Sequence, residues 1–175
     1  MATDQFVQIL MIVIPALIVF LTSFYLVKNF LDNENKKRML DVKTSSRELT
    51  TPIRLQAYER IVLFLERISP SSMIPRVNRP TLNARQLHSE LLQTIRNEFE
   101  HNLSQQIYIS NGAWEMVKNA KEEILKLVNL SAMKVSETAP SSELAQVIIQ
   151  ASSLAQKLPT QHAVEFIKKE IAQNF

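Results

Sequence analysis

Three histidines and their acidic neighbours are the side chains best suited to chemistry. His101 follows Glu98 by three positions, and this Glu-x-x-His spacing ligates metal in helical bundles when a second such pair faces it. The sequence contains no second pair, and His88 and His162 belong to other parts of the chain. We therefore interpret the histidines as surface or partly buried residues, and we expect no metal site and no catalytic base among them.

Other residues that support catalysis or cofactor binding are scarce. The 175 residues include no cysteine, which excludes disulfides and thiolate metal sites, and only one glycine, Gly112. A single glycine cannot form the glycine-rich loops that hold nucleotide phosphates, and no Gly-x-Ser-x-Gly nucleophile motif is present. The sequence therefore predicts that the chain is not an enzyme and binds no cofactor.

Residues 69–80 offer a different kind of site. Their sequence, SPSSMIPRVNRP, has three prolines, so we expect a loop without helix. Its apolar side chains are expected to be buried, either beneath the loop or against a partner. The arginines in and after it indicate either a phosphate or lipid-headgroup site or a solvated loop. The candidate partner loop consists of Met73, Ile74, Arg76, Val77 and Arg79, with Arg85 close by.

One stretch near the N-terminus is long and uncharged. Residues 6–27 read FVQILMIVIPALIVFLTSFYLV, and a helix needs about 20 apolar residues to cross a bilayer. We predict a transmembrane helix with a kink at Pro15. A cleaved signal peptide is the alternative. It fits less well, because the start is acidic and the apolar run exceeds the usual length of about 7–15 residues.

Small and polar residues fall mostly along one face of this predicted helix. Gln8, Pro15 and Thr22 are spaced by seven positions, as are Ala16 and Ser23. Such residues mark helix–helix contacts within membranes, so we expect this face to contact a copy of the chain or another membrane subunit. In the alternative interpretation, Gln8 reaches the outer interface and Thr22 hydrogen-bonds its own backbone.

The net charge of +3 is unevenly distributed, with a basic excess just after the apolar stretch. Lys28, Lys36, Lys37 and Arg38 are expected to face anionic lipid headgroups. Flanks rich in lysine and arginine stay in the cytoplasm, which predicts an N-terminus outside it and a C-terminal domain inside. The basic excess does not extend over that domain, so we expect no nucleic-acid partner.

The remaining sequence is typical of a helical domain. We expect residues 1–47 to form the transmembrane helix with a basic extension, a first break at residues 44–46, and residues 48–175 to form the domain. Apolar residues recur there at helical spacing between capping residues. The fold class predicted is all-α, with one N-terminal transmembrane helix and a cytoplasmic bundle of about five helices. The predicted helices begin near Thr51, Asn83, Ser110, Ser141 or Ser142, and Pro159, and one carries apolar residues four apart at Leu87, Leu91, Ile95, Phe99, Leu103 and Ile107.

Three further segments carry a resemblance to known proteins. They read MIVIPALIVFLTSFYLVKNFLDNENKKRML, IRLQAYERIVLFLERISPSSMIPRV and ARQLHSELLQTIRNEFEHNLSQQIYIS. In them the chain resembles a group of small, single-span Bacteroidota membrane proteins of unknown function. The resemblance implies a bacterial inner-membrane protein with a cytoplasmic domain, and it implies no activity.

Two functions follow from these expectations. The first is a membrane-anchored structural or accessory subunit, or scaffold, of a larger bacterial inner-membrane complex. It rests on the apolar stretch, the helical domain and the lack of grouped catalytic residues. The alternative is a membrane-tethered cytoplasmic binding module that recognises lipid headgroups, a small ligand or a soluble partner. The residue 69–80 stretch and the basic flank favour that alternative.

Overall fold

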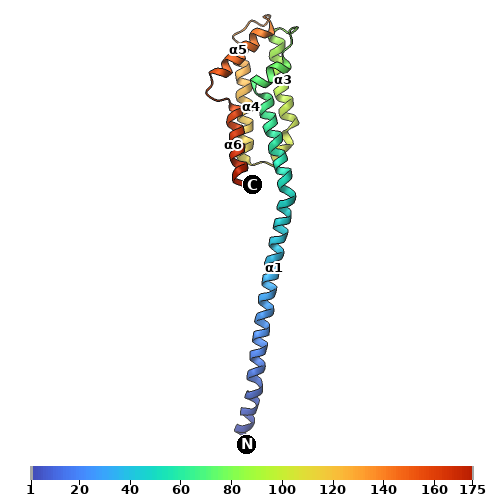
Figure 1. Cartoon of the computed structure of the whole chain (residues 1–175), viewed down its shortest axis with the longest axis vertical. Coiled ribbons are helices and arrows are strands. Elements are labelled where there is room, and N and C mark those ends of the chain that lie inside the picture. The colour runs from blue at the N-terminus through green and yellow to red at the C-terminus, as the bar shows by residue number, and fades with distance from the viewer. Residues whose placement is uncertain (1, 175) are drawn as a thin grey trace. The chain divides into compact units, whose positions relative to one another are not determined.

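Regular structure in the described part of the chain is entirely helical. The computed structural model describes the backbone of residues 2–174 and the side-chain surroundings of residues 13–39 and 49–173. No strand occurs between residues 2 and 174, so the all-α prediction is confirmed. The elements (Figure 1) are α1 (Ala2–Ile68), α2 (Pro70–Val77), α3 (Ala84–His101), the 3-10 helix η1 (Leu103–Ile107), α4 (Asn111–Ala132), α5 (Ser141–Leu154) and α6 (Pro159–Asn174).

The chain divides into two compact units, Met1–Thr50 and Thr51–Phe175. The first unit is the N-terminal part of α1. Within it, Val13–Met39 is long and apolar enough to cross a membrane, judged by length and composition, with a mean hydropathy of 1.7 in its most apolar window. None of that window is buried within the protein. A helix that could serve as a membrane span is therefore present, as predicted.

The break predicted at residues 44–46 is absent, because α1 continues through this stretch to Ile68. Serine and threonine cost a helix only about 0.5 kcal/mol each relative to alanine, and good helix formers precede and follow them. The helix also passes through Pro52, so the start predicted near Thr51 is wrong. The strong helix formers on either side outweigh these local signals.

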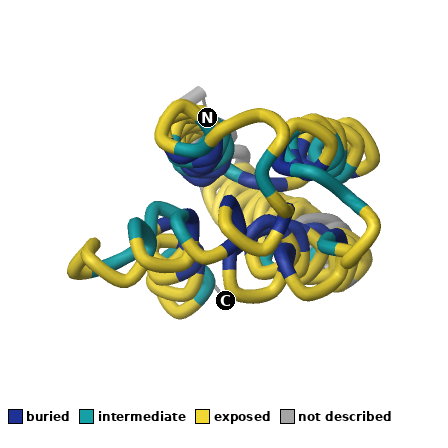
Figure 2. The backbone as a smooth tube through the Cα atoms, turned by 90° about the horizontal axis from the view of Figure 1, so that it is seen from above, coloured by how far each residue is buried: buried dark blue, intermediate teal, exposed yellow. Residues whose placement is uncertain are grey.

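The second unit, Thr51–Phe175, has one hydrophobic core, to which the end of α1 contributes. Helix α4 packs against α3, α5 and α6, while α2 packs against α3 and α5. Apolar residues spaced three or four apart share a face of each helix, and Figure 2 shows these buried faces turned towards one another. The largest fully buried side chains are Tyr58, Phe64, Ile61, Leu65, Ile68, Met73, Leu87, Leu91, Ile95, Ile124, Leu144 and Ile148.

The loop predicted over residues 69–80 is instead largely the short helix α2. Pro70 stands in its first turn, where proline needs no partner for a backbone N–H, and only Pro75 lies further inside. Met73, Ile74 and Val77 lie on the buried face of α2. Their spacing fits one face of a helix, which the three prolines in the segment concealed. Of the two burial alternatives, burial within the protein is observed.

Helix α3 confirms its predicted start and corrects its predicted end. Asn83 forms a capping box with Gln86, in which the Gln86 N–H donates to Asn83 Oδ1 at 2.8 Å and the Asn83 N–H donates to Gln86 Oε1 at 3.0 Å. The helix ends at His101, because Asn102 Nδ2 donates to the Glu98 carbonyl at 2.8 Å and the chain tightens into η1. Ile107, the last residue of the predicted apolar stripe, is 75% exposed instead of buried.

Candidate functional site

The start of α3 and the segment that links α4 to α5 lie side by side and form one edge of the bundle. The Ala84 N–H donates to the Ala139 carbonyl at 2.8 Å, and the Arg85 N–H donates to the Glu137 carbonyl at 3.1 Å. At the start of α5, the Ser141 N–H donates to the carbonyl of Leu82, which lies just before α3, at 3.1 Å. These backbone bonds hold the linking segment against the start of α3.

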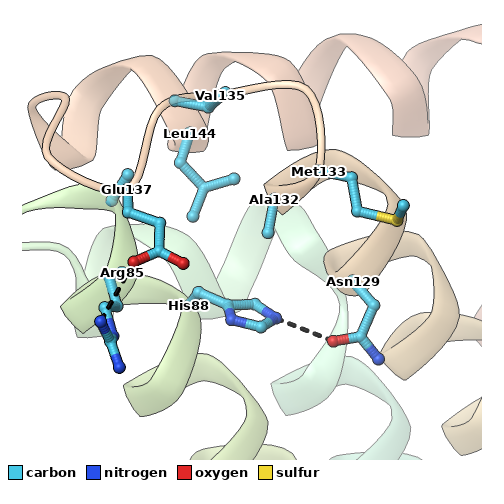
Figure 3. Close-up of a pocket in the computed structure, with 9 residues that line it drawn as sticks. Arg85, His88, Asn129, Ala132, Met133, Val135, Glu137 and Leu144 are labelled. Carbon is cyan, nitrogen blue, oxygen red and sulfur yellow. Dashed lines mark hydrogen bonds and ion pairs between the residues drawn. The ribbon is translucent and has the colours of Figure 1, made fainter.

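A hollow of about 310 Å³ lies at this edge (Figure 3). Polar groups stand around it in two pairs: Arg85 Nη1 lies 3.1 Å from Glu137 Oε2, and His88 Nε2 lies 2.8 Å from Asn129 Oδ1. The backing of the hollow is apolar and includes the fully buried Leu144. The lining residues are Ala84, Arg85, His88, Asn129, Ala132, Met133, Val135, Glu137 and Leu144.

The hollow is suited to binding, since its polar groups offer ion-pair and hydrogen-bond partners beside an apolar wall. His88 contacts the side-chain amide of Asn129. Sequence reasoning treated His88 as an isolated side chain. Its partner Asn129 is 41 positions away, and the partner of Arg85 is 52 positions away, so no local pattern could reveal either pair.

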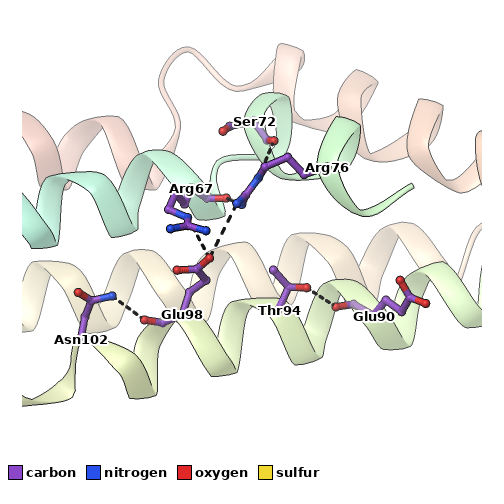
Figure 4. A network of polar contacts seen from close by, with 7 residues as sticks. All are labelled: Arg67, Ser72, Arg76, Glu90, Thr94, Glu98 and Asn102. Carbon is purple, nitrogen blue, oxygen red and sulfur yellow. Dashed lines mark hydrogen bonds and ion pairs between the residues drawn. The ribbon is translucent and has the colours of Figure 1, made fainter. Parts of the chain in front are cut away.

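A second polar cluster joins α1, α2 and α3 (Figure 4). The carboxylate of Glu98 lies 2.9 Å from Arg67 Nε and 3.8 Å from Arg76 Nη1. Arg76 also donates to the Arg67 carbonyl at 2.7 Å, near the end of α1. Two guanidinium groups thus surround the Glu98 carboxylate, and the cluster holds the short helix α2 against its neighbours.

Glu98, the acidic residue of the Glu-x-x-His motif, is therefore already paired with two arginines. His101 lines a shallow hollow with Arg67, Thr94, Asn97 and Glu98, but the Glu98 carboxylate is bound by arginine. Among the side chains that the structure describes, no group of three or more histidine, aspartate and glutamate residues could hold a metal ion.

A third polar cluster ties together α1, α4 and α6. The hydroxyl of Tyr58 and the hydroxyl of Ser110 both donate to the carboxylate of Glu170, the latter at 2.6 Å. Ser110 also accepts the Ala113 N–H at 3.0 Å, which is its predicted role as the cap of α4. Burial raises the pKa of Tyr58, and the hydrogen bond to Glu170 raises it further. Glu170 lies 112 positions from Tyr58, so no local pattern in the sequence could reveal this contact.

The residues of the candidate partner loop serve the fold. Met73, Ile74 and Val77 are buried within the second unit. Arg76 contacts Glu98, whereas Arg79 Nη2 lies 3.2 Å from Glu90 Oε2. Arg76, Arg79 and Arg85 were interpreted as either a phosphate or headgroup site or part of a solvated loop, and each of them contacts a different carboxylate.

The predicted contact face of the apolar helix is partly described. Pro15, Ala16, Thr22 and Ser23 are exposed, and the side chain of Gln8 lies outside the described residues. Thr22 Oγ1 lies within hydrogen-bond distance of the carbonyls of Ile18, at 2.9 Å, and Val19, at 3.0 Å. This is the backbone bonding weighed as the alternative for Thr22, and exposure leaves the rest of the face open to contact.

The four basic residues expected at lipid headgroups are exposed as well. Lys28, Lys36, Lys37 and Arg38 all present their side chains to the surroundings of α1. Arg38 Nε lies 3.6 Å from Glu34 Oε1, one helical turn earlier, in a surface ion pair. Such a pair contributes little to stability, so Arg38 remains able to interact with an anionic surface.

Comparisons with known proteins place the chain in a family but give it no activity. No curated protein and no solved structure is significantly similar to it. The profile of one family of unknown function matches residues 4–174, which is nearly the whole chain. The match includes the apolar helix as well as the helical bundle. The chain therefore belongs to the family of unknown function DUF7935.

Proposed function

We propose that the chain is a membrane-anchored accessory subunit, or scaffold, of a larger bacterial inner-membrane complex. The observation that carries this proposal is the contrast within α1. Val13–Met39 is apolar enough to cross a bilayer and has no buried residue in its most apolar window, whereas the unit Thr51–Phe175 has a core of its own. The first part needs apolar surroundings that the chain does not supply, and a membrane supplies them.

The proposed orientation rests on charge. The basic residues follow the apolar stretch and do not precede it, and such residues are retained in the cytoplasm. The N-terminus then lies outside the cytoplasm, and the helical bundle lies inside it. Lys28, Lys36 and Lys37 would meet anionic headgroups at the cytoplasmic surface.

The proposed partner contact is made by the small and polar face of the span. Residues such as Ala16 and Ser23 let two helix backbones approach closely, and each interhelical hydrogen bond contributes about 0.5–2 kcal/mol. The face would pack against a second copy of the chain or a helix of another subunit. A scaffold of this kind needs no catalytic group.

The test compares two triple variants of the full chain, extracted in mild detergent. The first variant carries Gln8→Leu, Ala16→Ile and Ser23→Leu, and the second, which is the control, carries Leu10→Ile, Leu17→Ile and Phe24→Leu. Both are expected to insert in the membrane, because both stay apolar. The expected result is that the first variant falls to a smaller particle in native mass spectrometry, while the second keeps the wild-type size and composition. Equal particles from both variants and the wild type would remove the proposed contact.

A second function is favoured by one specific observation, the hollow beside His88 (Figure 3). In this function the bundle is a membrane-tethered cytoplasmic module that binds a small ligand. The backbone that carries Arg85 and Glu137 is held by hydrogen bonds before any ligand arrives, which lowers the entropic cost of binding. Changing the polar face of the span would leave such binding intact, so the two functions are separable by experiment.

A further inference from the structure

The hollow beside His88 combines one positively charged side chain, one negatively charged side chain and an apolar wall. The side chains of Arg85 and Glu137 are 75% and 72% exposed, and their charged groups lie 3.1 Å apart. An ion pair as exposed as this one contributes little to stability, so a bound molecule can separate the two groups at small cost. We propose that the hollow binds a small zwitterion with an aliphatic body, whose acidic group meets Arg85 and whose ammonium group meets Glu137.

Charge balance selects a zwitterion over the alternatives. A purely anionic ligand at Arg85 would stand beside the carboxylate of Glu137, only 3.1 Å from the guanidinium. A purely cationic ligand at Glu137 would stand beside Arg85 in the same way. A zwitterion gives each member of the pair an opposite charge, so no charged group loses its partner.

The apolar wall selects an aliphatic body for the ligand. Leu144 is fully buried behind the hollow, and Ala84, Ala132 and Val135 complete that side. Met133 stands at the rim with 82% of its surface exposed, and a flexible thioether at a rim can fold over apolar groups of different shapes. The volume of about 310 Å³ lies at the lower end of the range of ligand pockets, which is about 300–1,000 Å³. This size fits a ligand as small as an amino acid.

His88 completes the polar side of the hollow. A carboxamide oxygen only accepts hydrogen bonds, so Nε2 of His88 is the donor in the contact with Asn129 Oδ1. In the tautomer that carries its only proton on Nε2, Nδ1 is a hydrogen-bond acceptor, of the kind that an ammonium group requires. Figure 3 shows the imidazole between Glu137 and Asn129, which puts both acceptors for the ammonium group on one side of the hollow.

This chemistry has two sources, a free α-amino acid with an aliphatic side chain and a zwitterionic lipid headgroup such as ethanolamine phosphate. Both carry one acidic group and one ammonium group at short range. The inference deepens the second proposed function, the binding module. It is independent of the scaffold, because it involves only residues of the bundle.

The test uses the full-length chain in detergent micelles and follows the imidazole signals of its three histidines by NMR. The expected result is that L-leucine shifts the His88 signal saturably at millimolar concentration, while the signals of His101 and His162 stay in place. 4-Methylpentanoate lacks the ammonium group and 3-methylbutylamine lacks the carboxylate, and each should bind at least about tenfold more weakly than leucine. If glycerophosphoethanolamine, whose phosphodiester carries a single negative charge as the lipid headgroup does, binds more tightly than leucine, the source is the headgroup.

Variants connect the signal to the hollow. Arg85→Gln should weaken leucine binding at least about tenfold, whereas Arg79→Gln, which removes an exposed ion pair with Glu90 outside the hollow, should not. Ala132→Leu should abolish binding by filling the space. Its control, Ala155→Leu, alters a separate hollow between α4 and the segment before α6.

Three results would overturn the inference. The first is an unmoved His88 signal with both zwitterions at about 10 mM, a concentration that would populate even a weak site. The second is equal binding of leucine and either of its single-charge analogues. The third is leucine binding that Arg85→Gln and Ala132→Leu leave unchanged. None of these results bears on whether the span assembles with other subunits.

Discussion

The two parts of α1 use the same residue types in opposite ways. In the first unit Ile18 and Leu21 are 55% and 53% exposed, whereas in the second unit Ile61 and Leu65 have no exposed surface. The difference lies in the pattern around the helix, because residues 13–27 are uncharged and carry large apolar side chains around most of the helix, whereas residues 51–68 are apolar on one face. One part finds its apolar surroundings inside the chain, and for the other we propose that a lipid bilayer supplies them.

The largest effect is expected when the same change, isoleucine to aspartate, is made in each unit. Ile74→Asp places a carboxylate in the core, where Ile74 is 4% exposed, and should cost at least about 4 kcal/mol of folding free energy. The bundle should unfold while the chain stays in the membrane fraction. The measurements are circular dichroism of the purified protein and membrane flotation.

Ile18→Asp should have the opposite outcome. A charge near the middle of a span costs about 2.5–3.5 kcal/mol of insertion free energy, so more of the chain should appear in the soluble fraction with its bundle still folded. If Ile18→Asp unfolds the bundle, or Ile74→Asp leaves it folded, the two parts do not differ in the way proposed.

A smaller effect is expected at the buried hydroxyl of Tyr58. Because the pKa of Tyr58 is raised above 10.0 in the folded protein, the neutral hydroxyl stabilises the fold below pH 10.0, and this contribution is lost as pH rises through the folded-state pKa. Tyr58→Phe should cost about 1 kcal/mol near pH 8. The difference from wild type should shrink in urea unfolding above pH 10.0, and a constant difference would contradict the role of this hydroxyl.

The smallest effect is expected from removing the first unit. Residues 48–175 should give a soluble, helical fragment that unfolds cooperatively, because the apolar faces of the bundle cover one another. Its melting temperature should match that of the bundle in the full chain. An insoluble or non-cooperative fragment would show that the core of the second unit is incomplete without α1's N-terminal part or a partner.

Sequence reasoning succeeded where the signal was local. The caps at Asn83 and Ser110 and the buried positions Leu87, Leu91 and Ile95 follow from residue types and a spacing of three or four. The same reasoning failed where local signals conflicted. Prolines concealed the helix over residues 70–77, and three weak helix formers suggested a break that stronger neighbours override.

The candidate site could not have been predicted from one sequence. His88 and Asn129 meet only because α3 and α4 pack side by side, and Arg85 meets Glu137 only because backbone bonds hold the linking segment against α3. These contacts depend on packing between helices, for which composition and periodicity carry no information. The candidate membrane span could be predicted from the sequence, because its length and low charge are properties of one continuous stretch.

The membrane placement is the central claim, and cysteine labelling tests it most directly because the chain has no cysteine of its own. Single cysteines are introduced as Thr3→Cys and Ser136→Cys, and intact cells are treated with a thiol reagent that cannot cross the membrane. We predict that the chain sediments with membranes. The cysteine at position 3 should be labelled in intact cells, and the cysteine at position 136 should be labelled only after lysis. Labelling at position 136 but not at position 3 in intact cells, or a chain found in the soluble fraction, would contradict this placement.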